Sequence, residues 1–366
     1  LENKQINIIG GGCSAFSLAR LSDQLPNYSF NIFTGDKTKK VNDHFWGFWN
    51  INVNNEAYNN ANYTWSNWAI NTNSSSHVLS SKKHPYCVIK RDKWLNFCKS
   101  NFQTKKIKIF KQNVSEKNEI LFVNDKKING NLIFDSRPPE IPSNILLQHF
   151  EGFIVNSKKD VFDDKTVILM DFRCDQSKGM HFIYLLPFSK KKALVESTMF
   201  SKNIESKEFY LTEISQYLKK YFNLEEFSKS NHEKGVIPMH EISLISKGRY
   251  NIGTRGGAVR PSSGYAFTFI QKQAFQIISQ LAKGRKINTN IHKKSDLFLD
   301  KVFINVIDKF PDIVPKIFAN LANSINGDEM AKFMSGNCSL ITTLKIILSM
   351  PKIPFIKSFF YVVTRQ

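Results

Sequence analysis

The chain has 366 residues, of which 42% are apolar, so it is long enough for two domains or one elaborated domain with a large core. The net charge of +20 comes mainly from lysines spread along the chain, and it does not by itself indicate a nucleic-acid partner. The five cysteines are odd in number and form no Cys-x-x-Cys pair, which argues for a reducing compartment and against structural disulfides or a zinc site.

A glycine-rich turn follows the first predicted strand. Apolar residues at 6–9 lead into Gly10-Gly11-Gly12-Cys13-Ser14-Ala15 and then into a helix with an apolar side. Gly10 permits the tight turn, Gly12 lets the backbone approach a pyrophosphate, and Ala15 lets the helix pack closely on the strand. Free N–H groups at the helix start favour phosphates. We therefore predict FAD or NAD binding here; the alternative is a strand, turn and helix without a ligand.

The second predicted strand, at 29–33, ends without the acidic residue that usually binds the ribose hydroxyls of a dinucleotide. Thr34 follows the strand directly, and Asp36 is the first carboxylate after it. We assign the ribose contact to Asp36, with Thr34 as the alternative. Arg91, where a later predicted strand runs into a helix, is a further candidate for the cofactor contact.

Residues 41–80 are rich in asparagine and contain four of the five tryptophans. We predict that Trp46, Phe48 and Trp49 form an aromatic wall around a large apolar or cationic ligand. The alternative is a loop region whose aromatic side chains pack into a core.

Short strands with polar turns are predicted from 105 to 135, and the last of them ends at Asp135. In dinucleotide-binding folds a late strand of this kind often ends beside the cofactor. Asp135 is therefore a candidate for cofactor binding, and the alternative is a strand-ending carboxylate in an ion pair.

Three strand-like runs between 166 and 200 follow one another with short polar connections, which predicts an antiparallel sheet. The period of two in the last run places on one face Leu194, Glu196, Thr198 and Phe200. Because apolar surroundings disfavour a charged carboxyl group, we expect the pKa of Glu196 to be raised. The alternative is a glutamate on a solvent-facing side of the strand.

A second glycine-containing turn lies late in the chain, between a predicted strand at 250–254 and a long helix that runs to about residue 283. A serine of this turn can cap the helix, whose N-terminus is again an anion site. A flavin-binding fold with two glycine loops requires a second contact of this kind, whereas the alternative is a plain helix cap. The candidate residues are Pro261, Ser262, Ser263, Gly264 and Tyr265.

The last 80 or so residues are predicted to be helical, because apolar residues recur at helical spacing from 297 to 310. Residues 340–361 are apolar, contain three lysines and no acid, and fit an anionic membrane surface. The alternative is a helix packed on the body of the protein. No uncharged apolar run reaches the ~18 residues of a membrane span.

Taken together, these segments resemble the lycopene cyclase family, in its bacterial and plant β-cyclase forms. The resemblance covers nearly the whole chain, although each match alone is unspecific. The matching segments are the glycine turn, residues 42–48 (Asn-Asp-His-Phe-Trp-Gly-Phe), 135–137 (Asp-Ser-Arg), 170–173 (Met-Asp-Phe-Arg), 184–189 (Tyr-Leu-Leu-Pro-Phe-Ser), 194–198 (Leu-Val-Glu-Ser-Thr) and 260–265 (Arg-Pro-Ser-Ser-Gly-Tyr). Two positions depart from the family pattern: the displaced acid after the second strand, and Ser197, where the plant motif has a second glutamate.

The resemblance implies an α/β fold with a Rossmann-like FAD-binding domain, an antiparallel-sheet substrate domain and a helical C-terminal region. We place the FAD-binding domain at 1–160 with a return at 235–285. The substrate domain is placed at 161–234, and the helical C-terminal region at 286–366. It also implies acid–base cyclisation of the ψ-ends of lycopene, or of a related acyclic carotene, to β-ionone rings without net redox change. Glu196 is the implied acid and Asp171 a second catalytic candidate.

Further expectations from the resemblance are reduced FAD as cofactor, NAD(P)H as its reductant, and peripheral attachment to the cytoplasmic face of the inner membrane, with no nucleic-acid partner. Two rival functions stay open. One is a flavin-dependent hydroxylase or polyprenyl reductase of the same fold. The other is a basic, non-enzymatic protein that binds membranes or nucleic acid through its lysines.

Overall fold

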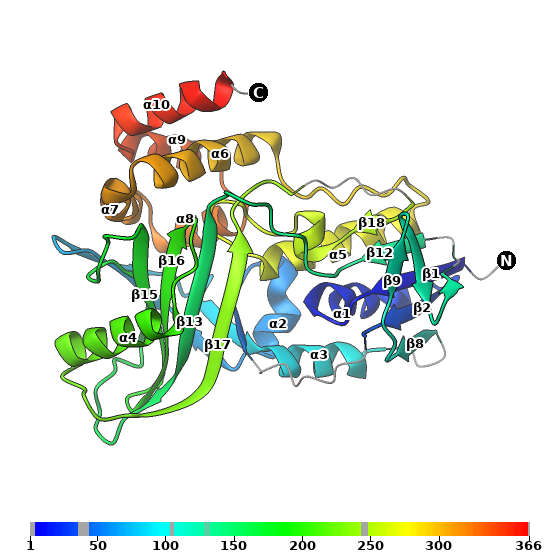
Figure 1. Ribbon diagram of the computed structural model, residues 1–366, viewed down its shortest axis with the longest axis horizontal. Coiled ribbons are helices and arrows are strands. Elements are labelled where there is room, and N and C mark those ends of the chain that lie inside the picture. Colours follow the sequence, from blue (N-terminus) through cyan, green and yellow to red (C-terminus); the bar gives the residue numbers. More distant parts are fainter. Residues whose placement is uncertain are drawn as a thin grey trace.

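A computed structural model describes residues 4–35, 44–102, 106–128, 130, 132–242 and 248–364. Figure 1 shows an α/β part around the N-terminus, a large twisted sheet beside it, and a group of helices formed by the C-terminal residues. The N-terminal glycine turn and the late turn at 253–265 meet in the α/β part.

A five-stranded parallel sheet forms the centre of the α/β part. Its strand order is β18-β12-β1-β2-β8, and every neighbouring pair is parallel. Side chains on both faces of the central strand are buried, as in Ile8 and Ile9, which pack into separate cores on opposite faces and explain the apolar end of the strand. The strands are β1 (Lys4–Ile9), β2 (Tyr28–Phe33), β8 (Ile107–Phe110), β12 (Leu132–Asp135) and β18 (Tyr250–Asn251).

Helices and a small sheet cover this parallel sheet. Helices α1 (Cys13–Ala19), α3 (Arg91–Ser100) and α5 (Phe267–Ala282) share one apolar core with β1 and β2. A separate core joins Ile9 and Phe33 to a three-stranded antiparallel sheet. That sheet consists of β9 (Ser115–Lys117), β10 (Ile120–Val123) and β11 (Lys126–Lys127).

A seven-stranded sheet builds the second part, in the order β17-β13-β16-β15-β14-β5-β6. Its neighbours are antiparallel except β14 and β5, which run parallel. Helix α4 (Lys207–Phe222) packs on one face of this sheet. The strands are β5 (Asn67–Asn71), β6 (Ser76–Ser80), β13 (Leu147–Asn156), β14 (Thr166–Asp171), β15 (Met180–Ser189), β16 (Lys192–Ser201) and β17 (Ser228–Pro238).

The seven-stranded sheet draws strands from outside the range 161–234 that we predicted for it. Strands β5, β6 and β13 precede that range, and β17 extends beyond it. A third sheet of order β3-β7-β4 lies between the two parts. It comprises β3 (Phe45–Trp49), β4 (Tyr63–Trp65) and β7 (Tyr86–Lys90), with α2 (Asn55–Asn59) beside it.

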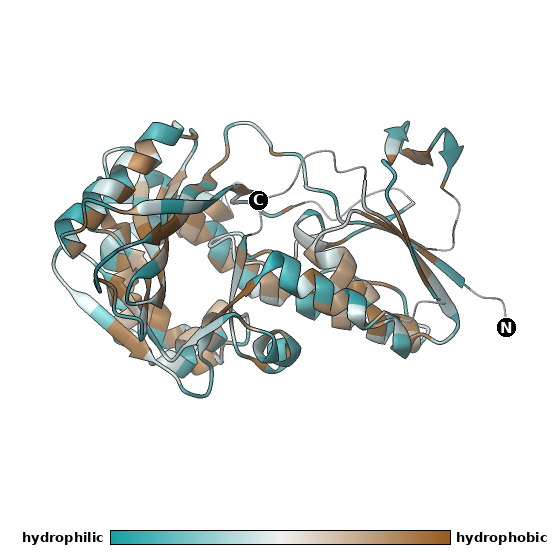
Figure 2. Ribbon diagram, turned by 90° about the horizontal axis from the view of Figure 1, so that it is seen from below, coloured by the Kyte–Doolittle hydropathy of each residue, from teal (hydrophilic) through white to brown (hydrophobic). Residues whose placement is uncertain are grey.

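Five C-terminal helices cover the other face of the seven-stranded sheet (Figure 1). Pro351 separates the last two, because proline cannot continue the first helix. Figure 2 shows that apolar segments of the sheet and of these helices turn towards each other. The helices are α6 (Lys294–Lys309), α7 (Val314–Ser324), α8 (Gly327–Met334), α9 (Leu340–Ser349) and α10 (Lys352–Val363).

Candidate functional site

A cavity of about 1570 Å³ runs from the glycine turn to the C-terminal helices. Its walls come from the carboxyl ends of the parallel strands, the inner face of the seven-stranded sheet, and helices α6 to α10. Pockets for a single drug-sized ligand have volumes of about 300–1,000 Å³. The cavity therefore has room for a large cofactor and a long substrate together.

The N-terminal glycine turn forms one end of the cavity through Gly10, Gly11, Gly12, Cys13 and Ser14. Gly10 has a φ of +106°, and a Cβ there would overlap the Ser136 hydroxyl. A Cβ on Gly12 would meet nothing within 4 Å in the described part of the chain, and it would enter the cavity. Packing thus explains Gly10, whereas the space beside Gly12 is open to the cavity.

The remaining residues of the turn and its surroundings differ in exposure to the cavity. Ala15 is fully buried in the core of α1, as a close helix contact requires. Burial raises the pKa of the Cys13 thiol to about 12, so this cysteine is a neutral group. Thr34 and Arg91 line the cavity. Asp36, to which we assigned the ribose contact, lies outside the described residues.

The predicted cofactor contact at Asp135 requires correction. Asp135 is completely buried and is not among the described residues that line the cavity. Its carboxylate accepts hydrogen bonds from Nε and Nη2 of Arg137, at 3.0 and 2.6 Å. Arg137 and Ser136 do line the cavity. Asp135 therefore positions Arg137, and the arginine presents its charge to the cavity.

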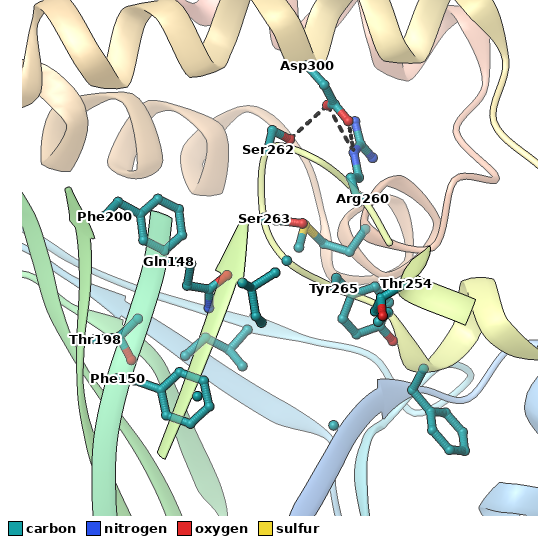
Figure 3. A pocket seen from close by; sticks show the side chains of 18 of the residues that line it. Gln148, Phe150, Thr198, Phe200, Thr254, Arg260, Ser262, Ser263, Tyr265 and Asp300 are labelled. Atoms are coloured by element: carbon teal, nitrogen blue, oxygen red, sulfur yellow. Dashed lines mark hydrogen bonds and ion pairs between the residues drawn. The ribbon is translucent and has the colours of Figure 1, made fainter. Parts of the chain in front are cut away.

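The late turn contributes fewer polar groups than we predicted. The Ser262 hydroxyl donates to Asp300 Oδ1 at 2.7 Å, and Arg260 Nε donates to the same atom at 3.1 Å. Figure 3 shows both interactions on the side of the turn that faces α6. Pro261 is not among the described residues that line the cavity. The predicted helix cap is also wrong, because α5 begins only at Phe267 and no side chain caps it.

Most residues of this turn nevertheless face the cavity. Arg260, Ser262, Ser263, Gly264 and Tyr265 all line it, although the Ser262 hydroxyl donates to Asp300. The Ser263 hydroxyl is buried, yet it has no hydrogen-bond partner among the described residues. The same is true of Gln148 Oε1 on β13, which lies next to Gly264, the residue after Ser263 (Figure 3). Two buried polar atoms without partners mark a place where a polar ligand group fits.

The aromatic wall is formed by two of the three predicted side chains. Trp46 and Trp49 line the cavity. Phe48 is fully buried and stacks on Phe267 with ring centroids 4.9 Å apart, so we correct its assignment to the core. Trp49 packs edge-on against Tyr265, whose hydroxyl accepts from the Trp49 backbone N–H at 3.0 Å.

Glu196 lies in the middle of strand β16, on the face that we predicted. It is 8% exposed, and burial raises the pKa of its carboxyl group to about 8. On β15, Tyr184 pairs with it, and the Tyr184 and Tyr86 hydroxyls are 2.8 Å apart. The residues of β16 that line the cavity are Leu194, Glu196, Thr198 and Phe200. This is the arrangement of a carboxylic acid that is kept neutral by an apolar site.

Comparison with known proteins decides the family. Residues 5–359 match the family described as lycopene cyclase protein. The chain belongs to the lycopene cyclase family. No curated protein sequence matches it.

Several solved structures share the fold of this cyclase-family chain at low sequence identity. A geranylgeranyl bacteriochlorophyll reductase-like protein from Thermoplasma acidophilum is 12% identical, with a TM-score of 0.62 and 99% of each chain covered. A flavin-dependent brominase is 10% identical, with a TM-score of 0.62 and coverage of 99% of this chain and 100% of the other. A flavoprotein/dehydrogenase from Cytophaga hutchinsonii is 12% identical, with a TM-score of 0.58 and coverage of 95% and 99%. The predicted α/β fold class is confirmed.

Asp171, our second catalytic candidate in this lycopene cyclase-family chain, requires correction. It is completely buried and is not among the described residues that line the cavity. Arg173 Nε donates to its Oδ1 at 2.8 Å, and Tyr217 and Asn71 donate to Oδ2 at 2.7 and 3.0 Å. This carboxylate ties α4 and β5 to β14, and we withdraw it from the catalytic set.

The structure also shows where the side chain of Ser197 lies, at the position where the plant cyclase motif has a second glutamate. Ser197 lies on the face of β16 opposite to Glu196, is fully buried, and bonds to His181 Nε2 at 2.8 Å. A second glutamate at this position would point away from the cavity.

Two cavity residues of this cyclase-family chain carry no local sequence signal. Glu233 lies in the polar first half of β17, and it is 6% exposed. Tyr86 follows a turn and carries no motif. Strand pairing through β13 brings Glu233 to Glu196, and packing of β7 on the large sheet brings the Tyr86 hydroxyl to Tyr184, so no local pattern reveals either contact.

Proposed function

We propose that the protein is a flavin-dependent carotene cyclase that forms β-ionone rings from the ψ-ends of lycopene or a related acyclic carotene. The observation that carries this proposal is Glu196, a buried and protonatable carboxyl group in an apolar cavity beside an aromatic wall, in a chain of the lycopene cyclase family. A redox enzyme of the same fold does not require such an acid.

The residues of the cavity fit FAD. The backbone around Gly12 would receive the pyrophosphate, and Arg91 and Arg137 would neutralise phosphate charge. The unpartnered Ser263 hydroxyl and Gln148 oxygen would bind polar groups nearer the ring system. When bound in its reduced form, with NAD(P)H as reductant, FAD would supply an electron-rich ring next to the substrate.

Glu196 begins the proposed reaction by donating its proton to the terminal double bond of the substrate. The neighbouring double bond attacks the resulting cation and closes a six-membered ring, and loss of a ring proton completes the product. The apolar side chains around Glu196 exclude water, which would otherwise capture the cation. Rings of Trp46, Trp49 and Tyr184 present electron-rich faces to this region of the cavity.

Expression in lycopene-accumulating bacteria, followed by pigment analysis, tests the function. Cyclic carotenes of unchanged mass support the proposal. Products with added hydrogen or oxygen, or steady NAD(P)H oxidation coupled to oxygen, would instead support a reductase or hydroxylase of the same fold. The reductase-like neighbour makes that outcome the main rival.

The raised pKa of Glu196 predicts the pH dependence of cyclisation. The acid form donates the proton, and it predominates below a pKa of about 8. The rate with liposome-bound lycopene should therefore be level just below that value and fall roughly tenfold per unit well above it. Thermal unfolding and flavin retention at each pH are the controls. A rate that rises above pH ~8 would contradict the assignment.

We further propose peripheral attachment to the cytoplasmic face of the inner membrane through α9 and α10. Their apolar side chains are unusually exposed, with Leu340 at 84%, Leu348 at 72% and Phe360 at 60%. Ile347, Ile356 and Phe360 of the same helices line the cavity, so a carotene dissolved in lipid has an apolar path into it.

Among the described residues, no single helix is long and apolar enough to cross a bilayer; α9 and α10 meet those criteria only when taken together, as a pair bent by 114°.

Charged substitutions on α9 test this attachment. Leu344→Asp with Leu348→Asp should reduce flotation with anionic liposomes at least about tenfold, since both side chains are largely exposed and each would place a charge in the interface. Ile204→Asp is the matched control, because Ile204 is 57% exposed but lies far from these helices in sequence, before α4. Equal flotation of the double variant and the parent would exclude α9 from membrane contact.

A further inference from the structure

We propose that Glu233 is a second catalytic carboxylate of this site, and that Glu196 and Glu233 act across Gly152 as proton donor and proton acceptor. This inference rests on the proposed cyclisation and names the group that receives the ring proton. It also accounts for a glycine in the middle of a long, well-paired strand.

Strand register brings the two carboxyl groups together. Gly152 on β13 pairs with Glu196 on β16 and with Glu233 on β17. Residues directly opposite each other across a sheet share a face, so both glutamates lie on the side of Gly152 that faces the cavity. Both line the cavity, and at ~4.8 Å per strand their Cα atoms are about 10 Å apart. Two glutamate side chains span that gap over a residue without a side chain.

Gly152 leaves the space that the pair needs. Its φ is not positive, so its backbone conformation suits any residue. A Cβ at this position would lie 2.5 Å from Glu196 Cγ and 2.6 Å from the Val195 carbonyl oxygen. The glycine is thus required by the close approach of Glu196 and of the β16 backbone, and not by its own backbone angles.

The two carboxyl groups have different surroundings. The Phe45 N–H and the Asn231 side-chain amide donate to Glu233, at 3.5 and 3.4 Å, and such donors favour the charged form. Burial instead raises the pKa of Glu196 and favours its acid form. A neutral Glu196 beside a charged Glu233 is the arrangement that donor and acceptor require.

Both glutamates lie within electrostatic reach of one tyrosine. Burial raises the pKa of Tyr184 well above its usual value, and the Tyr86 hydroxyl and the charges of Glu196 and Glu233 raise it further. Besides the two glutamates, the titratable side chains that line the cavity are Cys13, His44, Tyr86, Arg91, Arg137, Tyr184, His232, Lys234, Arg260, Tyr265, Asp300 and Lys352.

The proton balance closes without an external acid. Glu196 gives its proton to the alkene, whose π electrons form the new C–H bond, and ring closure consumes the neighbouring π bond. The electrons of a ring C–H bond then form the product double bond, and that proton passes to the Glu233 carboxylate. Glu233 returns it to Glu196, so no oxidant or reductant is consumed and the starting state is restored.

Two variants test the acceptor role. With liposome-bound lycopene, Glu233→Gln should lower kcat about ten- to a hundredfold with little change in KM, and Glu233→Asp should recover part of it. The fall in rate at high pH should also move to lower pH in Glu233→Gln, because a negative charge beside Glu196 is removed. Glu226→Gln, an exposed glutamate, should match the parent.

Infrared spectroscopy separates this inference from the function itself. The carbonyl band of a protonated carboxylic acid should disappear as the pH rises through the pKa of Glu196, be absent in Glu196→Gln, and titrate at lower pH in Glu233→Gln. An unshifted band together with parental kcat in Glu233→Gln would overturn the pairing. If the parent protein makes no cyclic carotene, the proposed function is overturned, and so is the proposed return of the proton from Glu233 to Glu196.

Discussion

Glu196→Gln is expected to abolish detectable ring formation while folding and flavin binding persist. The amide keeps the shape of the side chain but cannot protonate an alkene. General acid–base groups contribute typically ~10²–10⁴-fold, and here the same group begins the reaction. Pigment analysis in lycopene-accumulating bacteria measures the loss.

The matched control for this variant is Glu226→Gln, which makes the same change at an exposed position. It should give the parental pigment profile. If Glu196→Gln still cyclised lycopene at a near-parental rate, the acid would lie elsewhere, and Glu233 would be the first residue to examine.

Gly12→Val is expected to raise the Kd for flavin at least ~100-fold, a loss of about 2.7 kcal/mol of binding free energy, and to leave the fold intact. Gly12 has extended backbone angles, with φ −101° and ψ −168°, which valine adopts without strain. Its Cβ would project into open space at the cavity end. The valine would therefore occupy the place that we assign to the pyrophosphate. Flavin fluorescence titration measures binding, and thermal unfolding of the flavin-free protein measures the fold.

Gly10→Val provides the contrast. Gly10 has a positive φ, and a side chain there would overlap Ser136, so this variant should lose stability as well as flavin. Unchanged flavin affinity in Gly12→Val would contradict the assignment of the phosphate site.

The sequence predicted best what depends on local periodicity. The period of two in β16 correctly placed Glu196 with Leu194 and Phe200 on one face, because that strand is regular and fully paired. The glycine turn was equally visible, since its conformation follows from its own residues.

What the sequence could not predict depends on contacts between distant segments. Asp171 matched a family motif, yet Tyr217 from α4 and Asn71 from β5 bind its carboxylate away from the cavity. Ser262 likewise matched the late turn, but its hydroxyl donates a hydrogen bond to Asp300 of α6. Glu233 reaches Glu196 through strand register alone. These partners lie at least 37 positions away in sequence, beyond any local pattern.

The measurement that tests the central claim most directly is the mass of the product formed in D₂O. Purified protein with reduced flavin would be given liposome-bound lycopene in D₂O, and the carotenes analysed by mass spectrometry. Because the proton returned to Glu196 exchanges with solvent before the next substrate binds, and a substrate proton is lost in each cycle, the proposed mechanism predicts a single deuterium for each ring closed. Cyclic product without deuterium, or product that gains two hydrogens or an oxygen, would contradict acid–base cyclisation.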